Sequence, residues 1–232
     1  IQKKISKNLL INLLFLFIFG IFQSIIGWWM VKSGLDQNPY VSSYRLAFHL
    51  TNAVIIISVL FWLTINSFYK TKLKFIPTTR FEYVFFTLIM LILLTIVSGA
   101  FMAGSDAGKS FNTYPLMNGS FIPDGYFLES YGFRNFFENT IAINFNHRWL
   151  ATFTFISIVC FTIYLFSEKN YNKYNFKIKI ILFFSCMQFV LGILTLLTNV
   201  KVYLASLHQV NSLLLLASLI YMYHSVKKQK VL

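Results

Sequence analysis

The stretch FEYVFFTLIMLILLTIVSGAFMA, residues 81–103, decides the fold class of this chain. It holds 23 residues, of which only Glu82 is charged. A helix needs about 20 apolar residues, at a rise of about 1.5 Å each, to cross the hydrocarbon core of a bilayer. A strand is a poor alternative, because lipid cannot satisfy the backbone groups of an open strand. The stretch therefore predicts a transmembrane helix.

Five similar apolar runs lie on either side of this stretch. They cover Leu9–Val31, Ser43–Ile65, Ile141–Phe166, Ile178–Thr198 and Val202–Tyr223. Of the 232 residues, 57% are hydrophobic and 12% are charged, whereas a soluble domain carries about 25% charged residues. We therefore expect an all-α fold, a polytopic membrane helical bundle with six transmembrane helices.

The basic residues predict how the helices are oriented. Fourteen of the 20 fall in four clusters: before the first apolar run, after the second, after the fourth and after the sixth. Because each run crosses the membrane once, all four clusters lie on the same side. These are Lys3, Lys4 and Lys7; Lys70, Lys72, Lys74 and Arg80; Lys169, Lys173, Lys177 and Lys179; and Lys227, Lys228 and Lys230. The positive-inside rule then places both ends of the chain in the cytoplasm and loops 32–42, 104–140 and 199–201 outside the inner membrane of the cell.

The net charge of +13 raises the question of a nucleic-acid partner. The basic residues flank apolar runs instead of forming one basic face, and no nucleic-acid motif is present. The pattern excludes nucleic acid and leaves membrane lipid as the surrounding partner.

Three histidines are expected at one depth. His49, His147 and His208 each lie six residues from the outer end of a predicted span, about 9 Å below the boundary. Ionisable residues within spans are costly and usually functional. One such histidine is more often a packing residue, but three at one depth indicate a metal or cofactor. His224, near the other membrane face, is expected to be an inert interfacial residue.

Heme suits this pattern better than zinc. No cysteine pair or carboxylate accompanies the three histidines, whereas two imidazoles from facing helices are typical axial ligands of heme iron. Arg148 follows His147, and Arg45 lies one helical turn before His49, so both are predicted to bind heme propionates. The alternative for the arginines is that they extend to the membrane interface.

The loop at 104–140 is long and rich in aromatic residues. Loops of this length are uncommon unless they are functional or disordered, and the aromatic residues argue against disorder. We expect a lid, with Asp106, Lys109 and Asn112 shaping it, or else a packing loop at the interface.

An internal repeat connects two of the histidines. Gln23 and Gly27 precede His49 with the same Gln-x-x-x-Gly spacing that Gln188 and Gly192 show before His208. Duplicated helix pairs explain this repeat. We therefore expect residues 81–232 to form a four-helix half that contains His147 and His208. Residues 1–80 are expected to form the last two helices of another half, whose first two helices and fourth histidine precede residue 1.

Several segments resemble heme A synthase of the mitochondrial and alphaproteobacterial type. They are GWWMVKSGL at Gly27–Leu35, VSSYRLAFHL at Val41–Leu50, SGAFMAGSDAGKSFNTYPLM at Ser98–Met117, FFENTIAINFNHRWLA at Phe136–Ala151, QFVLGILTLL at Gln188–Leu197 and LASLHQVNSLLLL at Leu204–Leu216. They occur in consistent order from about residue 20 to 225.

The resemblance implies an oxidoreductase that converts the C8 methyl of heme O to the formyl of heme A for cytochrome c oxidase. It implies that His147 and His208 bind a heme b in the C-terminal half and that His49 belongs to the substrate-heme site. A catalytic glutamate and the partner of His49 would precede residue 1, so this chain is expected to lack the N-terminal catalytic segment. Heme O synthase and cytochrome c oxidase assembly factors are expected partners, and a homo-oligomer is left open.

Two other functions remain open on the sequence. An electron-transferring b-type membrane cytochrome would use the same histidine pair as His147 and His208. A transporter or assembly scaffold would use the histidines to line a polar cavity. Heme content and heme A production distinguish the three alternatives.

Overall fold

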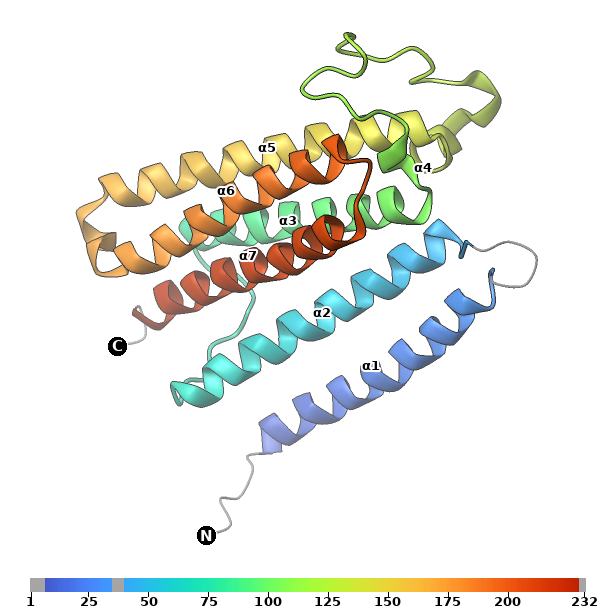
Figure 1. The fold of residues 1–232 in the computed structure, drawn as a ribbon. Coiled ribbons are helices and arrows are strands. Elements are labelled where there is room, and N and C mark those ends of the chain that lie inside the picture. The colour runs from blue at the N-terminus through green and yellow to red at the C-terminus, as the bar shows by residue number, and fades with distance from the viewer. Residues whose placement is uncertain (1–6, 35–39, 230–232) are drawn as a thin grey trace.

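Six long helices make up most of the computed structural model, which describes residues 7–34 and 40–229 (Figure 1). The helices are α1 (Lys7–Val31), α2 (Ser43–Phe68), α3 (Arg80–Gly104), α5 (Thr140–Ser167), α6 (Asn175–Leu197) and α7 (Val202–Gln229). Each is long and apolar enough to cross a bilayer. The described residues form no strand, only an isolated bridge between Met117 and Ser120. The predicted all-α membrane bundle is confirmed.

Four of the helices surround a common core. α3 packs against α5 and α7, and α6 packs against the same two helices, so α5 and α7 lie diagonally across the group. The core is formed by buried apolar side chains of all four helices, among them Phe85, Ile158, Ile181 and Leu219. Close packing among these side chains, and not exclusion of water, holds membrane-spanning helices together.

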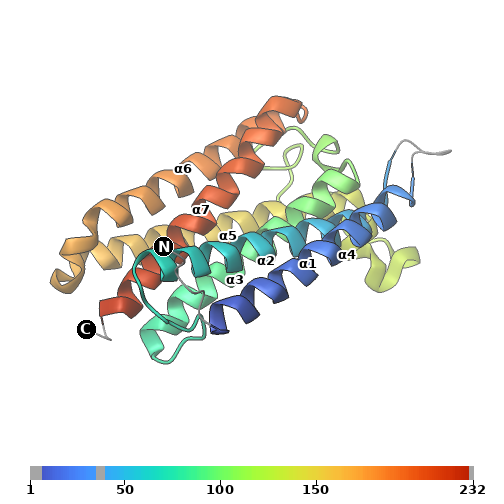
Figure 2. The ribbon, with the colours of Figure 1, turned by 90° about the horizontal axis from the view of Figure 1, so that it is seen from below.

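The first two helices lie on one flank of this group. α2 packs against α3 and α7, whereas the principal contact of α1 is α2 (Figure 2). The outward side chains of α1 are apolar, and Phe15 and Phe17 are 61% and 67% exposed. An apolar helix surface of this extent is suited to lipid.

The connections alternate between the two ends of the bundle. The turn after α1, residues 105–139 and the turn at 198–201 lie at one end, called here the loop end, while residues 69–79 and 168–174 lie at the opposite end. The lysines of 69–79, 168–174 and the end of α7 therefore share the opposite end, as the sequence predicts. Lys3, Lys4 and Lys230 of that prediction lie outside the described residues.

The opposite end is closed by a buried ion pair. Lys227 Nζ on α7 lies 2.8 Å from Glu82 Oε2 on α3, and the two side chains are 8% and 2% exposed. The same carboxylate oxygen accepts from the backbone N–H and hydroxyl of Thr78, and Lys227 also donates to the carbonyl oxygen of Ile76. These bonds join α3, α7 and the loop between α2 and α3.

His224 is not the interfacial residue that the sequence indicates. It is fully buried, because α7 continues six residues beyond the predicted end at Tyr223 and packs against the loop after α2. Its Nε2 lies 3.1 Å from Asn66 Oδ1 and 3.2 Å from Thr71 Oγ1, and its ring packs edge-on against Trp62. Tertiary packing of this kind leaves no signal in a single sequence.

Candidate functional site

Three histidines lie near the loop end of the bundle. His49, His147 and His208 stand six, seven and six residues after the first residues of α2, α5 and α7. All three are half-buried. At about 1.5 Å per residue, each histidine lies about 9–10 Å along its helix from the first residue, and a common depth in the membrane stays a prediction.

His208 is surrounded by side chains of the neighbouring helix α6. Gln188 Nε2 lies 3.3 Å from Nε2 of the ring. Gly192, one turn further along α6, lies so near that a Cβ atom there would be 3.0 Å from Cε1 of His208. Asn211, three residues after His208, donates from Nδ2 to Gln188 Oε1 at 2.8 Å. We call Gln188 and Asn211 the second amide pair.

His49 has the same surroundings on α1 and α2. Gln23 Nε2 lies 3.2 Å from its Nε2, and a Cβ atom at Gly27 would lie 3.0 Å from its Cε1. Asn52, again three residues after the histidine, donates to Gln23 Oε1 at 2.7 Å. Gln23 and Asn52 are called here the first amide pair. The internal repeat predicted from sequence is therefore also a repeat of side-chain geometry.

His147 has a different support, supplied by α3. Ser98 Oγ lies 2.7 Å from its Nδ1, and a Cβ atom at Gly99 would lie 3.3 Å from its Cε1. This hydrogen bond uses Nδ1 and leaves Nε2 for another ligand. A metal-binding histidine is typically held through its second nitrogen in this way.

His147 and His208 come from opposite sides of the four-helix group. Their helices, α5 and α7, lie diagonally across it. Nδ1 of His208 is buried without a hydrogen-bond partner. Two imidazoles on opposite helices, each beside a glycine, fit a planar heme with one axial ligand from each side.

Arg148 and Arg45, which are predicted to bind heme propionates, both form hydrogen bonds with protein groups. Arg148, 9% exposed, donates to Asn144 Oδ1 at 2.6 Å and to the carbonyl oxygens of Phe111 and Thr113 at 2.8 and 2.6 Å. These three bonds leave two of the five guanidinium N–H groups for another acceptor. No carboxylate pairs with Arg148 among the described residues.

Arg45 joins the first two helices. It donates to the carbonyl oxygen of Trp29 at 2.7 Å, and its guanidinium lies over the Trp29 ring at 4.4 Å. Such stacking and hydrogen bonding fix the relative position of α1 and α2 beside His49.

The long loop is anchored on α5. Asn144 donates to the carbonyl oxygen of Ala107 at 2.7 Å, and Tyr126 donates to Asn146 at 3.1 Å. Its short helices are η1 (Ala107–Lys109), η2 (Glu129–Arg134) and α4 (Asn135–Glu138). The loop therefore packs over the end of the bundle that carries the histidines.

Of the three residues predicted to shape a lid, Asp106 and Lys109 contact each other. Lys109 Nζ lies 3.0 Å from Asp106 Oδ1, and this hydrogen bond raises the pKa of Lys109. Asn112 is exposed. Neither arrangement distinguishes a lid from a solvated loop.

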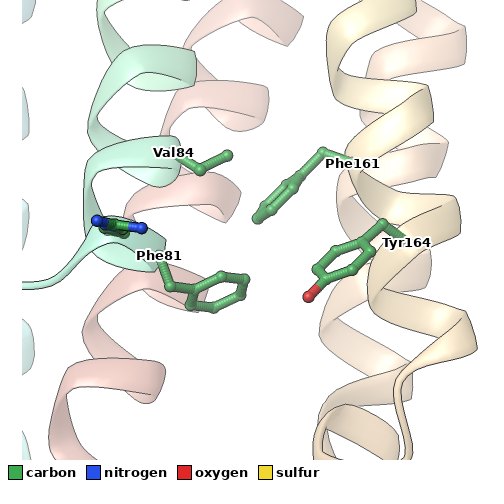
Figure 3. Close-up of a pocket in the computed structure, with 5 residues that line it drawn as sticks. Phe81, Val84, Phe161 and Tyr164 are labelled. Atoms are coloured by element: carbon green, nitrogen blue, oxygen red, sulfur yellow. The ribbon is translucent and has the colours of Figure 1, made fainter.

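Two hollow regions of the described surface lie away from the histidines. One of about 370 Å³ lies between α3 and α5, toward the opposite end, where Phe81 and Val84 point toward Phe161 and Tyr164 (Figure 3). A second of about 410 Å³ adjoins it. Neither hollow region is lined by a histidine. The candidate site is therefore defined by the three histidines and not by a cavity.

The comparison with known sequences decides the family. A profile of the family described as cytochrome oxidase assembly protein matches residues 1–220. The chain belongs to this family.

Relatives in the cytochrome oxidase assembly family bear the name heme A synthase. The protein of Wolbachia pipientis wMel is 37% identical over 232 residues, 99% of this chain and 64% of the relative. That of Nitrosospira multiformis is 34% identical over 230 residues, 98% of this chain and 65% of the relative. The Arabidopsis thaliana protein is 37% identical over 97% of this chain and 51% of its own length. The chain thus spans between half and two thirds of these relatives.

Three residues of the candidate site escaped prediction from the sequence. Asn52 and Asn211 complete the surroundings of His49 and His208, and each occurs as His-x-x-Asn. The shared spacing places each Asn on the face of its histidine, since residues three apart are neighbours on a helix. Ser98 was missed because nothing in the sequence pairs it with a residue 49 positions away.

Proposed function

We propose that this chain provides the heme-binding and substrate-binding helices of a heme A synthase, an oxidoreductase that converts the C8 methyl of heme O to the formyl of heme A. The observation that carries the proposal is the position of His147 and His208, near the same end of two diagonal helices. The relatives named heme A synthase support the choice of reaction. The product would serve cytochrome c oxidase, in line with the family description.

The resident cofactor in this proposal is a heme b held by His147 and His208. A heme supplies a redox centre that accepts and donates single electrons. Ser98 holds His147 from behind, and the second amide pair contacts His208. Gly99 and Gly192 keep side-chain bulk away from the two rings. The arrangement supports ligation by a residue from each side of a flat group.

The substrate site is assigned to His49. Its contacts with a glutamine, a glycine and, through the glutamine, an asparagine match those of His208, which supports a role for it toward a second heme. Conversion of a methyl to a formyl removes four electrons and four protons and adds one oxygen atom, which water supplies in balance. The electrons would leave through a redox partner beyond these residues. The residues near His49 bind and orient the substrate in this proposal.

Arg148 and Arg45 are assigned to the propionates of the two hemes. The free N–H groups of Arg148 support this role, and its bonds to Phe111 and Thr113 place the long loop beside it. The loop would then act as a lid that limits water access. Interfacial packing of the loop remains the alternative.

The positive-inside rule supports an orientation in the inner membrane of the cell with both ends of the chain in the cytoplasm. The loop end, with the three histidines, then faces outward. We assign residues 1–80 to the last two helices of one four-helix half and 81–232 to the other half. Heme O synthase and cytochrome c oxidase assembly factors are the expected partners, and homo-oligomers are not excluded.

The test is a turnover assay on the complete polypeptide in membranes. Cells that make heme O are supplied with the protein, and their pigments are extracted and separated. Heme A should accumulate with the wild type and be absent with His49→Ala. Bound heme b without any heme A would favour an electron-transferring cytochrome, and a protein without a Soret band after heme supplementation would contradict heme binding.

A further inference from the structure

In the second amide pair, a backbone carbonyl group determines which end of each side-chain amide is the NH₂ group. Asn211 Nδ2 lies 2.9 Å from the carbonyl oxygen of Phe184, and a carbonyl oxygen only accepts. This atom is therefore the NH₂ group. It also lies 2.8 Å from Gln188 Oε1, the acceptor end of that amide. The Gln188 NH₂ group then faces Nε2 of His208 at 3.3 Å.

A ring nitrogen that faces an N–H donor must accept. Nε2 of His208 therefore carries the electron pair, and the proton of the neutral imidazole is on Nδ1. In general, the hydrogen bond at one nitrogen of a histidine decides which nitrogen is protonated. The Nδ1–H form is costly for His208, because Nδ1 is buried without a hydrogen-bond partner among the described residues. Such an arrangement is understandable if Nε2 is the functional atom.

The first amide pair leads to the same result from a different anchor. Gln23 Nε2 donates to the carbonyl oxygen of His49 at 3.1 Å, which identifies it as the NH₂ group. The same atom lies 3.2 Å from Nε2 of His49, and Asn52 donates to the Oε1 end. Nε2 of His49 is therefore the acceptor, and its Nδ1 is likewise buried without a partner.

His147 acquires the same protonation state through a hydroxyl. Ser98 has a single hydroxyl proton, and this is donated to the carbonyl oxygen of Thr95 at 2.8 Å. Ser98 Oγ then accepts from Nδ1 of His147 at 2.7 Å. Three histidines on three helices thus all carry the proton on Nδ1, although their supports differ.

We propose that the first and second amide pairs hold His49 and His208 in the Nδ1–H form and cap the Nε2 atom at which each would bind a metal. In each pair the Asn fixes the direction of the Gln amide, and the Gln amide fixes the Nε2 electron pair of the histidine. The Gln hydrogen bond occupies this electron pair, so a heme iron would have to take the place of the Gln amide at Nε2. His147 has no such cap on Nε2 among the described residues. The proposal rests on the proposed function only for the identity of the metal group.

The protonation state can be measured without heme. The complete chain, labelled with ¹⁵N-histidine and stripped of heme in detergent, should show His208 in the Nδ1–H form by NMR. Gln188→Leu and Asn211→Leu remove the amide contacts at nearly constant volume, and each should convert His208 to a mixture of the two forms. Because the Gln amide and a heme iron would compete for Nε2 of His208, both variants should bind added heme at the two-histidine site at least as tightly as the wild type, seen by titration of the low-spin absorption.

Gln209→Leu is the matched control, because Gln209 adjoins His208 on the exposed side of α7 and lies outside the amide pair. It should keep the wild-type form and affinity. Gln23→Leu and Asn52→Leu should change His49 and leave His208 unaltered, which keeps the test valid if one variant in α6 or α7 fails to fold. Leu variants of either pair that retain a pure Nδ1–H form would overturn the proposal, as would heme binding that is much weaker than in the wild type or an equal effect of Gln209→Leu. If the wild type binds no heme, the proposed function fails, and the NMR result still decides this inference.

Discussion

The sites around His49 and His208 match in their contacts and differ in their neighbours. Each histidine has a glutamine, a glycine and an asparagine at matching distances from a pair of antiparallel helices. His208, however, lies within a group of four helices with His147 on the diagonally opposite helix, whereas α1 packs mainly against α2. A helix pair is therefore sufficient to build the surroundings of one histidine. The opposing ligand requires the additional helices α3 and α5.

Alanine substitution of the two histidines gives the largest contrast between the sites. His208→Ala removes one ligand of the proposed heme b, so the low-spin two-histidine absorption should disappear. His49→Ala should leave that absorption intact. Difference spectra of reduced and oxidised protein measure both. Loss of the signal to the same extent in His49→Ala would show that the His147 and His208 pairing is wrong.

Alanine in place of the glycines should have a smaller effect. Gly192→Ala puts a Cβ atom 3.0 Å from the His208 ring, so the ring must shift, and heme b retention should fall roughly tenfold. Gly27→Ala presents the same contact to His49 and should leave heme b retention unchanged. Retention is measured by transfer of heme to an acceptor protein.

Gly20→Ala is the control for this series, since a Cβ atom at Gly20 meets nothing within 4 Å. It should keep heme b and add helix stability of up to about 1 kcal/mol. Equal heme loss from Gly20→Ala and Gly192→Ala would show that close contact at His208 is unimportant.

Arg148 tests whether the loop contributes to the four-helix site. Arg148→Ala removes three hydrogen bonds, two of them to loop carbonyls, and should weaken heme retention several-fold and speed proteolysis within residues 105–139. Lys201→Ala, at an exposed position of the same end, should change neither. Equal heme retention in the two variants would argue against a propionate role for Arg148.

His224 should have the smallest effect on heme, because it lies at the opposite end from the other histidines. His224→Ala should preserve the heme absorption while lowering the free energy of unfolding by about 1–3 kcal/mol through loss of the contacts with Asn66 and Thr71. Spectra and thermal unfolding in detergent measure the two effects separately. A changed heme spectrum would show that the two ends are coupled.

The helices and the depth of the histidines could be predicted because both depend on local pattern. Runs of apolar residues identify spans by length alone, and the predicted starts lie within three residues of the observed ones. The end of α7 was misplaced because its last turns carry Lys227 and Lys228, which are polar in the sequence but packed against the loop after α2.

The contacts between helices could only be predicted where the chain repeats itself. The Gln-x-x-x-Gly spacing connected the sites of His49 and His208, and the same logic applied to His-x-x-Asn would have found Asn52 and Asn211. Ser98 and His147 meet once, across helices with no repeated counterpart, so no pattern indicates their contact. The bonds of Arg148 to backbone carbonyls are likewise invisible, because every residue has a carbonyl group.

The ion pair between Glu82 and Lys227 has a consequence for synthesis of the chain. The two residues are separated by 145 positions, so α3 leaves the ribosome long before Lys227 is synthesised. Until then the carboxylate lacks the ammonium group that compensates its burial, and a buried charge without its partner is strongly unfavourable. This end of the bundle therefore cannot complete its packing until the final helix has been inserted. A chain that stalls before residue 227 would lack the ion pair and would stay accessible to quality-control proteases.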